Sequence, residues 1–182
     1  MSKVLFYCDS GTNSPGLFTA NIDGSSAVKF AYSYTSLVGS NKTLQFSPDS
    51  NYFVFLEIPL YYGVGNLYAG AMDGSSMVMV NTPATASQGV TKFEVSSDSS
   101  KIIYLSSENT NGIDELMAAD IDGSNKMSIT TPDMFASGDV YNFKIAPNAS
   151  KVIYSLRTSD NRNKVYSANL DGTSQTRLSL DT

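Results

Sequence analysis

The stretch NIDGSS at residues 21–26 is one of four copies of the same short sequence. The other copies read AMDGSS at 71–76, DIDGSN at 120–125 and NLDGTS at 169–174. Their aspartates follow one another at intervals of 50, 49 and 49 residues. A strand-like run precedes each copy and another follows it, and Asp-Gly between two such runs is typical of a hairpin turn. The chain therefore repeats one structural unit four times.

Two further strand-like runs precede this hairpin in the repeated unit. The nearer run is continuously apolar, which is typical of a strand buried on both faces; it reads KVLFY, YFVFL, KIIYL and KVIYS. The farther run reads TLQF at 43–46, TKFEV at 91–95 and YNFKI at 141–145. It leads into a turn in which Pro48 and Pro147 preset the φ angle. Each unit is thus predicted to form four antiparallel strands, although the first unit has no such farther run.

A unit of this length with four short strands is typical of a propeller blade. We predict an all-β fold, a β-propeller of four-stranded antiparallel blades with four repeats in the chain. One domain is expected over 1–182, with repeats at approximately 1–41, 42–90, 91–139 and 140–182. The first blade is expected to lack its inner strand, which leaves an open strand edge.

Ring closure poses a problem for this incomplete first blade. After the last outer strand only Asp181 and Thr182 remain, too few to supply the missing inner strand. We expect a homodimer in which two chains, joined end to end, form one eight-bladed ring. A closed four-bladed monomer and a fragment of a longer propeller are the alternatives.

The sequence FSPDSNYFVF followed by NLYAGAMDGSS resembles the TolB-type, WD40-like β-propeller repeat. The usual pattern of that family is FSPDG, an apolar strand, then IY and DG. In this chain the turn glycine of the family is replaced by Ser50, Ser99 and Ala149. The resemblance covers nearly the whole chain and implies an interaction platform, which in this family occurs alone or beside a peptidase domain.

The composition argues against several function classes. A net charge of -5, with only 12 Lys and Arg, argues against nucleic-acid binding. The absence of histidine excludes Ser-His-Asp and Cys-His catalytic units and removes the commonest zinc ligand. DIDGSN resembles the start of a calcium loop but lacks the downstream bidentate glutamate, so the hairpin interpretation is preferred. We expect no metal and no cofactor.

The chain shows no sequence signal for membrane insertion. It has no run of about 18 apolar residues, and a strand-like segment begins at its second residue in place of a leader. The single Cys8 cannot form an internal disulfide. A cytoplasmic location is expected for the chain as given, and a periplasmic or secreted one if a signal peptide was removed.

The loops that depart from the repeat pattern are the candidates for partner binding. They connect the second and third strands of each unit, or lead from the outer strand to the next unit, and are expected to share one face. The candidate residues there are Tyr32, Tyr34, Tyr61, Tyr62, Asp114, Phe135, Arg157 and Arg162. Aromatic side chains suit peptide segments or sugar rings, and Arg suits a carboxylate or phosphate. Packing of the aromatic residues between blades is the alternative.

The sequence therefore predicts a non-catalytic interaction module that recognises a protein or peptide segment on this face. The alternative is a carbohydrate-binding or carbohydrate-active propeller in which two loop carboxylates act as acid and base. The candidate carboxylates are Asp9, Glu108, Asp114, Glu115 and Asp160.

Overall fold

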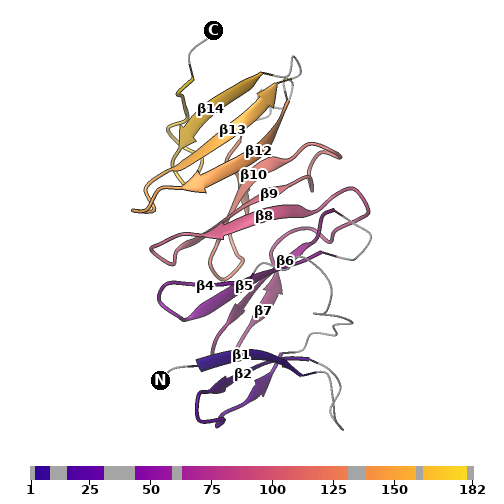
Figure 1. The fold of residues 1–182 in the computed structure, drawn as a ribbon, viewed down its shortest axis with the longest axis vertical. Coiled ribbons are helices and arrows are strands. Elements are labelled where there is room, and N and C mark those ends of the chain that lie inside the picture. Colours follow the sequence, from indigo (N-terminus) through magenta and orange to yellow (C-terminus); the bar gives the residue numbers. More distant parts are fainter. Residues whose placement is uncertain are drawn as a thin grey trace.

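The computed structural model describes residues 3–8, 16–30, 44–58, 63–130, 138–158 and 162–179. The described strands form four antiparallel sheets, which are stacked in sequence order along the long axis of the molecule (Figure 1). Each sheet corresponds to one predicted repeat and is called a blade below. No segment in these ranges forms a helix long and apolar enough to cross a membrane.

The strands follow one another from the inner to the outer edge of each blade. Blade 1 contains β1 (Lys3–Cys8), β2 (Gly16–Asn21) and β3 (Val28–Lys29). Blade 2 contains β4 (Leu44–Phe46), β5 (Tyr52–Glu57), β6 (Asn66–Ala71) and β7 (Met77–Met79). Blade 3 contains β8 (Val90–Val95), β9 (Lys101–Ser106), β10 (Glu115–Asp120) and β11 (Met127–Ser128). Blade 4 contains β12 (Gly138–Ile145), β13 (Val152–Thr158), β14 (Asn163–Ala168) and β15 (Thr176–Arg177). Within the described residues, the predicted order of four strands, with three in the first blade, is confirmed.

The four Asp-Gly pairs form the predicted hairpin turns. Their glycines have φ between +77° and +85°, a region that favours glycine. Each aspartate accepts a hydrogen bond from the backbone N–H two residues later, over 2.9 to 3.0 Å. These bonds explain why the pair recurs in every repeat.

The turns after the inner strands have a positive φ at the position where the TolB-type repeat has glycine. Ser50, Ser99 and Ala149 have φ of 61°, 60° and 54°. All three therefore lie in the left-handed region, where a side chain costs about 1 kcal/mol relative to glycine. The replacement of glycine has left the shape of the turn unchanged.

The core consists of apolar clusters between successive blades. In blade 3, Ile102 faces blade 2 and Ile103 faces blade 4, and both are fully buried. In blade 4, Val152 is fully buried while Ile153 is 46% exposed. The prediction that the second strand is buried on both faces is confirmed for β5 and β9 but is wrong for β1 and β13, whose residues alternate in burial. The physical reason is that blades 1 and 4 have a neighbouring blade on one side only.

The two end blades lie at opposite ends of the long axis (Figure 1). The described sheets therefore form an open stack, which differs from the closed four-bladed alternative. Every blade presents the same two faces. We call the end that carries the connections from second to third strand and from one blade to the next the loop face. The opposite end, with the inner-strand turns and the Asp-Gly turns, is the turn face.

Candidate functional site

Three of the predicted site residues lie within the described ranges. Asp114, Arg157 and Arg162 all belong to the loop face of blades 3 and 4. The aromatic candidates Tyr32, Tyr34, Tyr61, Tyr62 and Phe135 lie outside the described residues. The described candidates therefore lie in blades 3 and 4.

Asp114 links these two blades. The Thr91 hydroxyl donates a hydrogen bond of 3.0 Å to Asp114 Oδ2, while the Asp114 carbonyl accepts the Val140 N–H of blade 4 over 2.9 Å. Burial raises the pKa of Asp114, and the nearby carboxylate of Asp139 raises it further despite the hydrogen bond from Thr91. The joint thus holds two carboxyl groups, and the pKa of one of them is raised.

Arg157 and Tyr141 extend this cluster across blade 4. Arg157 lies opposite Asp139 in the register of β12 and β13, and the register shifts between Val140 and Asn142. Such a bulge re-aims the extra residue, which here is Tyr141. The Arg157 Cζ atom lies 5.8 Å from the centre of the Tyr141 ring, and Tyr141 is 46% exposed. An accessible aromatic ring and a guanidinium group are consequently close together on the strand pair β12–β13, and Asp139 is the register partner of Arg157.

Arg162 contributes to the loop that joins β13 and β14. Its backbone carbonyl accepts hydrogen bonds from the N–H and the hydroxyl of Thr158, both 2.8 Å long. These contacts involve the backbone of Arg162 and explain its position without reference to a ligand.

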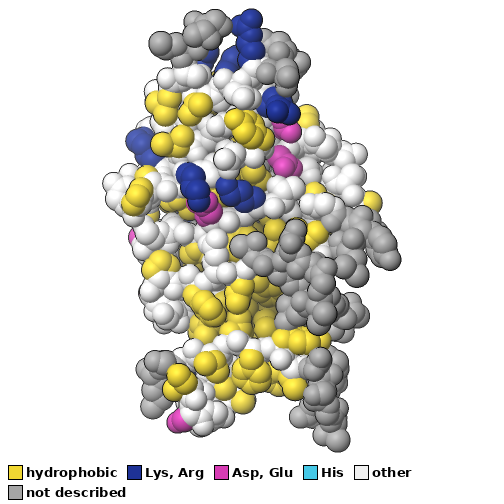
Figure 2. All heavy atoms as spheres, viewed as in Figure 1, with side chains coloured by type: hydrophobic (Ala, Val, Ile, Leu, Met, Phe, Trp, Pro, Cys, Tyr) yellow, Lys and Arg dark blue, Asp and Glu magenta, His cyan; other side chains and the backbone are white. Residues whose placement is uncertain are grey.

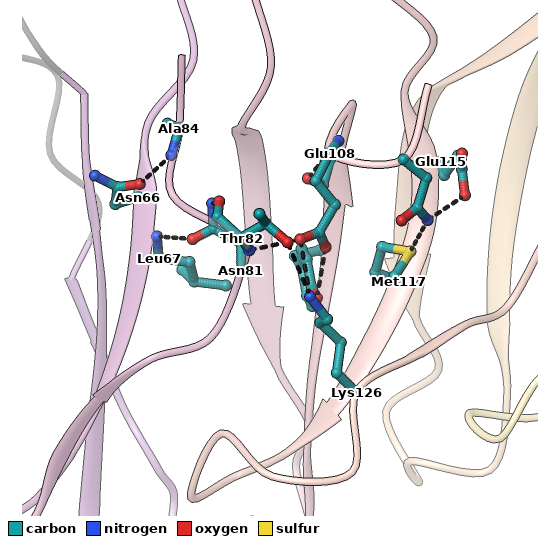
Figure 3. A network of polar contacts seen from close by, with 12 residues as sticks. Asn66, Leu67, Asn81, Thr82, Ala84, Glu108, Glu115, Met117 and Lys126 are labelled. Carbon is teal, nitrogen blue, oxygen red and sulfur yellow. Dashed lines mark hydrogen bonds and ion pairs between the residues drawn. The ribbon is translucent and has the colours of Figure 1, made fainter. Parts of the chain in front are cut away.

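Glu108 belongs to a polar network between blades 2 and 3 (Figure 3). Its carboxylate accepts the Thr82 N–H at 2.6 Å and the Lys126 ammonium at 2.9 Å, and its side chain is 2% exposed. Burial alone would raise the pKa of Glu108, but the Thr82 N–H and the Lys126 ammonium outweigh this effect and lower it. Glu108 is therefore committed to an ion pair within blade 3, and its hydrogen bond to Thr82 ties the connection that follows blade 2 to blade 3.

Glu115 is likewise engaged within blade 3. Asn109 Nδ2 and Thr110 Oγ1 donate to its buried carboxylate over 2.9 and 3.2 Å. Asp9 and Asp160 lie outside the described residues. Among the described candidates for acid–base chemistry, Asp114 alone combines a raised pKa with a neighbouring carboxylate.

The connection at 81–89 is a part of the loop face that the sequence did not single out. Asn81 accepts the Leu67 N–H and Asn66 accepts the Ala84 N–H, each over 2.7 Å, and these bonds tie the connection to β6 (Figure 3). Asp139 and Tyr141 were also missed, because Tyr141 stands in the inner-strand run YNFKI and is typical of scaffold. Its spacing of 50 residues from Thr91, the extra residue of the bulge in β8, is the signal that could have indicated it.

No group of three or more Asp, Glu, Cys or His residues within the described ranges is arranged to hold a metal ion.

Comparison with known proteins identifies the architecture. The chain matches a putative TolB from Agrobacterium tumefaciens with a TM-score of 0.55 and 15% identity over 96% of this chain and 60% of that one. The fold is a TolB-like β-propeller. TolB from Acinetobacter baumannii matches with a TM-score of 0.55 and 17% identity, over 97% of this chain and 40% of that one. A GH74 enzyme from Niastella koreensis matches with a TM-score of 0.57 and 17% identity, over 95% of this chain and 27% of that one.

The chain thus spans 60% and 40% of the lengths of the two TolB structures that it resembles. No protein-family model and no curated protein matches the sequence. At these low identities the likeness concerns the fold, in agreement with the resemblance seen in the repeated motif.

Proposed function

We propose that this chain is a non-catalytic binding module that recognises a segment of another protein on its loop face. The observation that carries the proposal is the exposed pair formed by Tyr141 and Arg157, whose Cζ-to-centroid distance is 5.8 Å. Tyr and Arg are enriched among the residues that dominate the binding energy of protein interfaces. Tyr141 lies in β12 and Arg157 in β13, so little conformational entropy would be lost when a partner binds.

The neighbouring charges define the kind of segment that would fit. Asp139 lies opposite Arg157 in the strand register, and the whole chain has a net charge of -5. A suitable partner would stack an apolar or aromatic side chain on Tyr141 and present a basic or hydrogen-bond-donating group to the Asp139 carboxylate.

Peptide selection tests this proposal. A phage-displayed library of random peptides would be panned on the immobilised chain, and the enriched peptides would be titrated against variants. Tyr141→Ala and Arg157→Ala should weaken binding at least tenfold, which corresponds to about 1.4 kcal/mol. Ile22→Ala removes an exposed apolar residue beside the first Asp-Gly turn and serves as the matched control. Equal affinity for all three variants would contradict the loop-face assignment.

The carbohydrate alternative is favoured by one specific observation. Asp114 has a raised pKa and lies near the carboxylate of Asp139, and acid–base hydrolysis of a glycoside uses a pair of carboxyl groups of which one has a raised pKa. A glycan array followed by hydrolysis assays tests this alternative. Binding of a glycan and its cleavage by the wild type, with cleavage lost in Asp114→Asn, would favour it over peptide recognition.

We further propose that a second copy covers the open faces of blades 1 and 4, so that two chains close one eight-bladed ring. The support is the exposure of Val4 and Phe6 on blade 1 and of Ile153 and Leu178 on blade 4. Because blade 1 has no described inner strand, such a joint would leave the inner part of blade 4, including Tyr141, uncovered. Light scattering should give twice the chain mass of 19.6 kDa, and a stable species at 19.6 kDa would contradict the ring.

A further inference from the structure

The inner edge of blade 1 differs from that of the other blades. β1 pairs with β2 and forms the edge of its three-stranded sheet. In blades 2, 3 and 4 the equivalent strand is paired on both sides, because an inner strand lies along its other edge. The open edge of β1 over Val4–Phe6 is therefore a template for one more antiparallel strand.

Blade 2 presents apolar side chains beside this open edge. Leu44 and Phe46 of β4 are 46% and 49% exposed. Phe93 and Phe143 occupy the position of Leu44 in blades 3 and 4, and they are only 3% and 2% exposed. Hydrophobic side chains accordingly gather over blades 1 and 2 in the space-filling view (Figure 2). In the joint of blades 3 and 4 the inner strand of blade 3 covers this position, since Lys92 Nζ lies 4.7 Å from the centre of the Phe143 ring, whereas blade 1 has no described inner strand to cover Leu44.

A cavity of about 890 Å³ opens at the turn face of the same joint. Its lining includes Lys3, Phe46, Ser50 and Tyr52. In the joint of blades 2 and 3, the equivalent place holds the inner-strand turn of blade 2, where the Asp49 N–H donates to Ser99 Oγ over 3.0 Å. Ser50 is the counterpart of Ser99, so the cavity has the position that an inner strand of blade 1 and its turn would occupy, and the described residues leave this position open.

The intact joints define which side chains suit this groove. Gln45 Oε1 accepts the Val95 N–H over 2.9 Å, and Glu94 Oε2 accepts the Ile145 N–H over 3.3 Å. Each acceptor therefore binds the last residue of the next inner strand. Phe46 is the counterpart of Val95 and Ile145. A strand added to β1 would need a Gln or Glu opposite Leu5 to accept the Phe46 N–H in the same way.

We propose that the groove between β1 and β4 binds an extended segment of another protein, which adds to blade 1 as its inner strand. The segment carries Gln or Glu between two apolar residues, followed by a turn of the Ser-Ser-Asp or Ser-Pro-Asp kind. Its apolar residues lie opposite Val4 and Phe6, and the N–H of its aspartate donates to Ser50 Oγ. This site is separate from the Tyr141 cluster and does not depend on the function proposed for it.

The chain supplies the probe and its control. The peptide TKFEVSSD, copied from residues 91–98, has the required pattern. In the control peptide, Glu94→Lys places a cation where the acceptor is needed. Lysine is compatible with an inner strand, because Lys144 occupies the counterpart of this position in β12, where its ammonium binds Glu94 of blade 3 over 2.5 Å. The labelled TKFEVSSD peptide should bind the 182-residue chain saturably, and the Lys version at least tenfold more weakly. No binding of TKFEVSSD at about 1 mM would overturn the proposal.

Protein variants and hydrogen exchange locate the binding. Phe46→Ser should weaken the TKFEVSSD peptide at least tenfold, whereas Ile22→Ala should leave its affinity unchanged. Amide exchange over Val4–Phe6 should be fast in the chain alone and slow with saturating peptide. This measurement remains decisive if Phe46→Ser fails to fold. Slow exchange without peptide would overturn the proposal, because another part of the chain or a second copy would then already occupy the edge.

Discussion

Blades 1 and 3 are built from the same repeat but hold their neighbours by different means. Blade 3 is tied to both neighbours by hydrogen bonds, which join Val95 to Gln45 on one side and Glu94 to Ile145 on the other. The contacts shown between blades 1 and 2 are mainly apolar, with Phe30 and Phe53 in edge contact at 5.2 Å. The polar ties of the inner strands require an inner strand on both sides, which blade 1 lacks in the described residues.

The Asp-Gly turns provide the largest test of this difference. A Cβ atom at Gly123 would lie 2.5 Å from Val78 Cγ2 of the preceding blade, whereas at Gly24 it would meet nothing within 4 Å. Both glycines have a positive φ of +81° or more, which costs alanine about 1 kcal/mol. Overpacking should add about 1–3 kcal/mol at Gly123 alone. Urea unfolding of Gly123→Ala and Gly24→Ala should show this gap.

The same pair of variants also tests the open end of blade 1. If Gly24→Ala costs as much as Gly123→Ala, another surface must lie over the first turn. A second copy or a preceding blade would account for that result, and repeating the unfolding at several protein concentrations separates the two. A concentration-dependent cost indicates the second copy.

Glu108 tests the polar tie between blades 2 and 3, because its carboxylate binds the Thr82 N–H of the 81–89 connection as well as Lys126 of its own blade. Glu108→Gln leaves the Lys126 ammonium without its counter-charge and should lower the free energy of unfolding by about 2 kcal/mol at pH 7. The pKa of Glu108 is lowered in the folded chain. Its contribution is therefore present above the unfolded pKa of about 4.3 and is lost as the pH falls through the folded value. Wild type and Glu108→Gln should converge in acid, as followed by urea unfolding at a series of pH values.

Thr19 places an unsatisfied polar group on the side of blade 1 that faces blade 2. Its hydroxyl is fully buried and has no hydrogen-bond partner among the described residues, while blade 3 has Ala118 at the equivalent position. Thr19→Val keeps the shape and removes the unsatisfied group, so it should raise the free energy of unfolding by about 1 kcal/mol. A loss of stability in thermal unfolding would indicate that the hydroxyl has a partner in solution. Ser167→Val at the equivalent position of blade 4 is the control, because Ser167 is not among the buried unsatisfied groups.

The repeat explains why the fold could be predicted and the site could not. An Asp-Gly pair between two apolar runs defines a hairpin from local sequence, and four equally spaced copies then specify blades. The Tyr141 cluster depends on a bulge in β12 and on the packing of blade 4 against Asp114, which are tertiary features. Burial of Glu108 beside the 81–89 connection is a further example, since the sequence indicated a loop carboxylate available for acid–base chemistry.

The smallest predicted effect compares the two serines in the inner-strand turns. Ser50 and Ser99 share φ values of 61° and 60°, so glycine should relieve the same backbone strain at both positions. Ser99 Oγ also accepts the Asp49 N–H of the preceding blade, whereas Ser50 lines the cavity left at blade 1. Ser50→Gly should therefore raise the free energy of unfolding by about 0.5 kcal/mol. The free energy of unfolding of Ser99→Gly should lie about 1 kcal/mol below that of Ser50→Gly, because Ser99→Gly also removes the hydrogen bond to Asp49. Urea unfolding of both variants measures the difference, and equal effects would mean that the Asp49–Ser99 bond adds nothing to the joint. With TKFEVSSD peptide added, the wild type would gain a hydrogen bond from the peptide aspartate N–H to Ser50 Oγ. Ser50→Gly cannot form this bond, so its free energy of unfolding relative to wild type should fall toward that of Ser99→Gly.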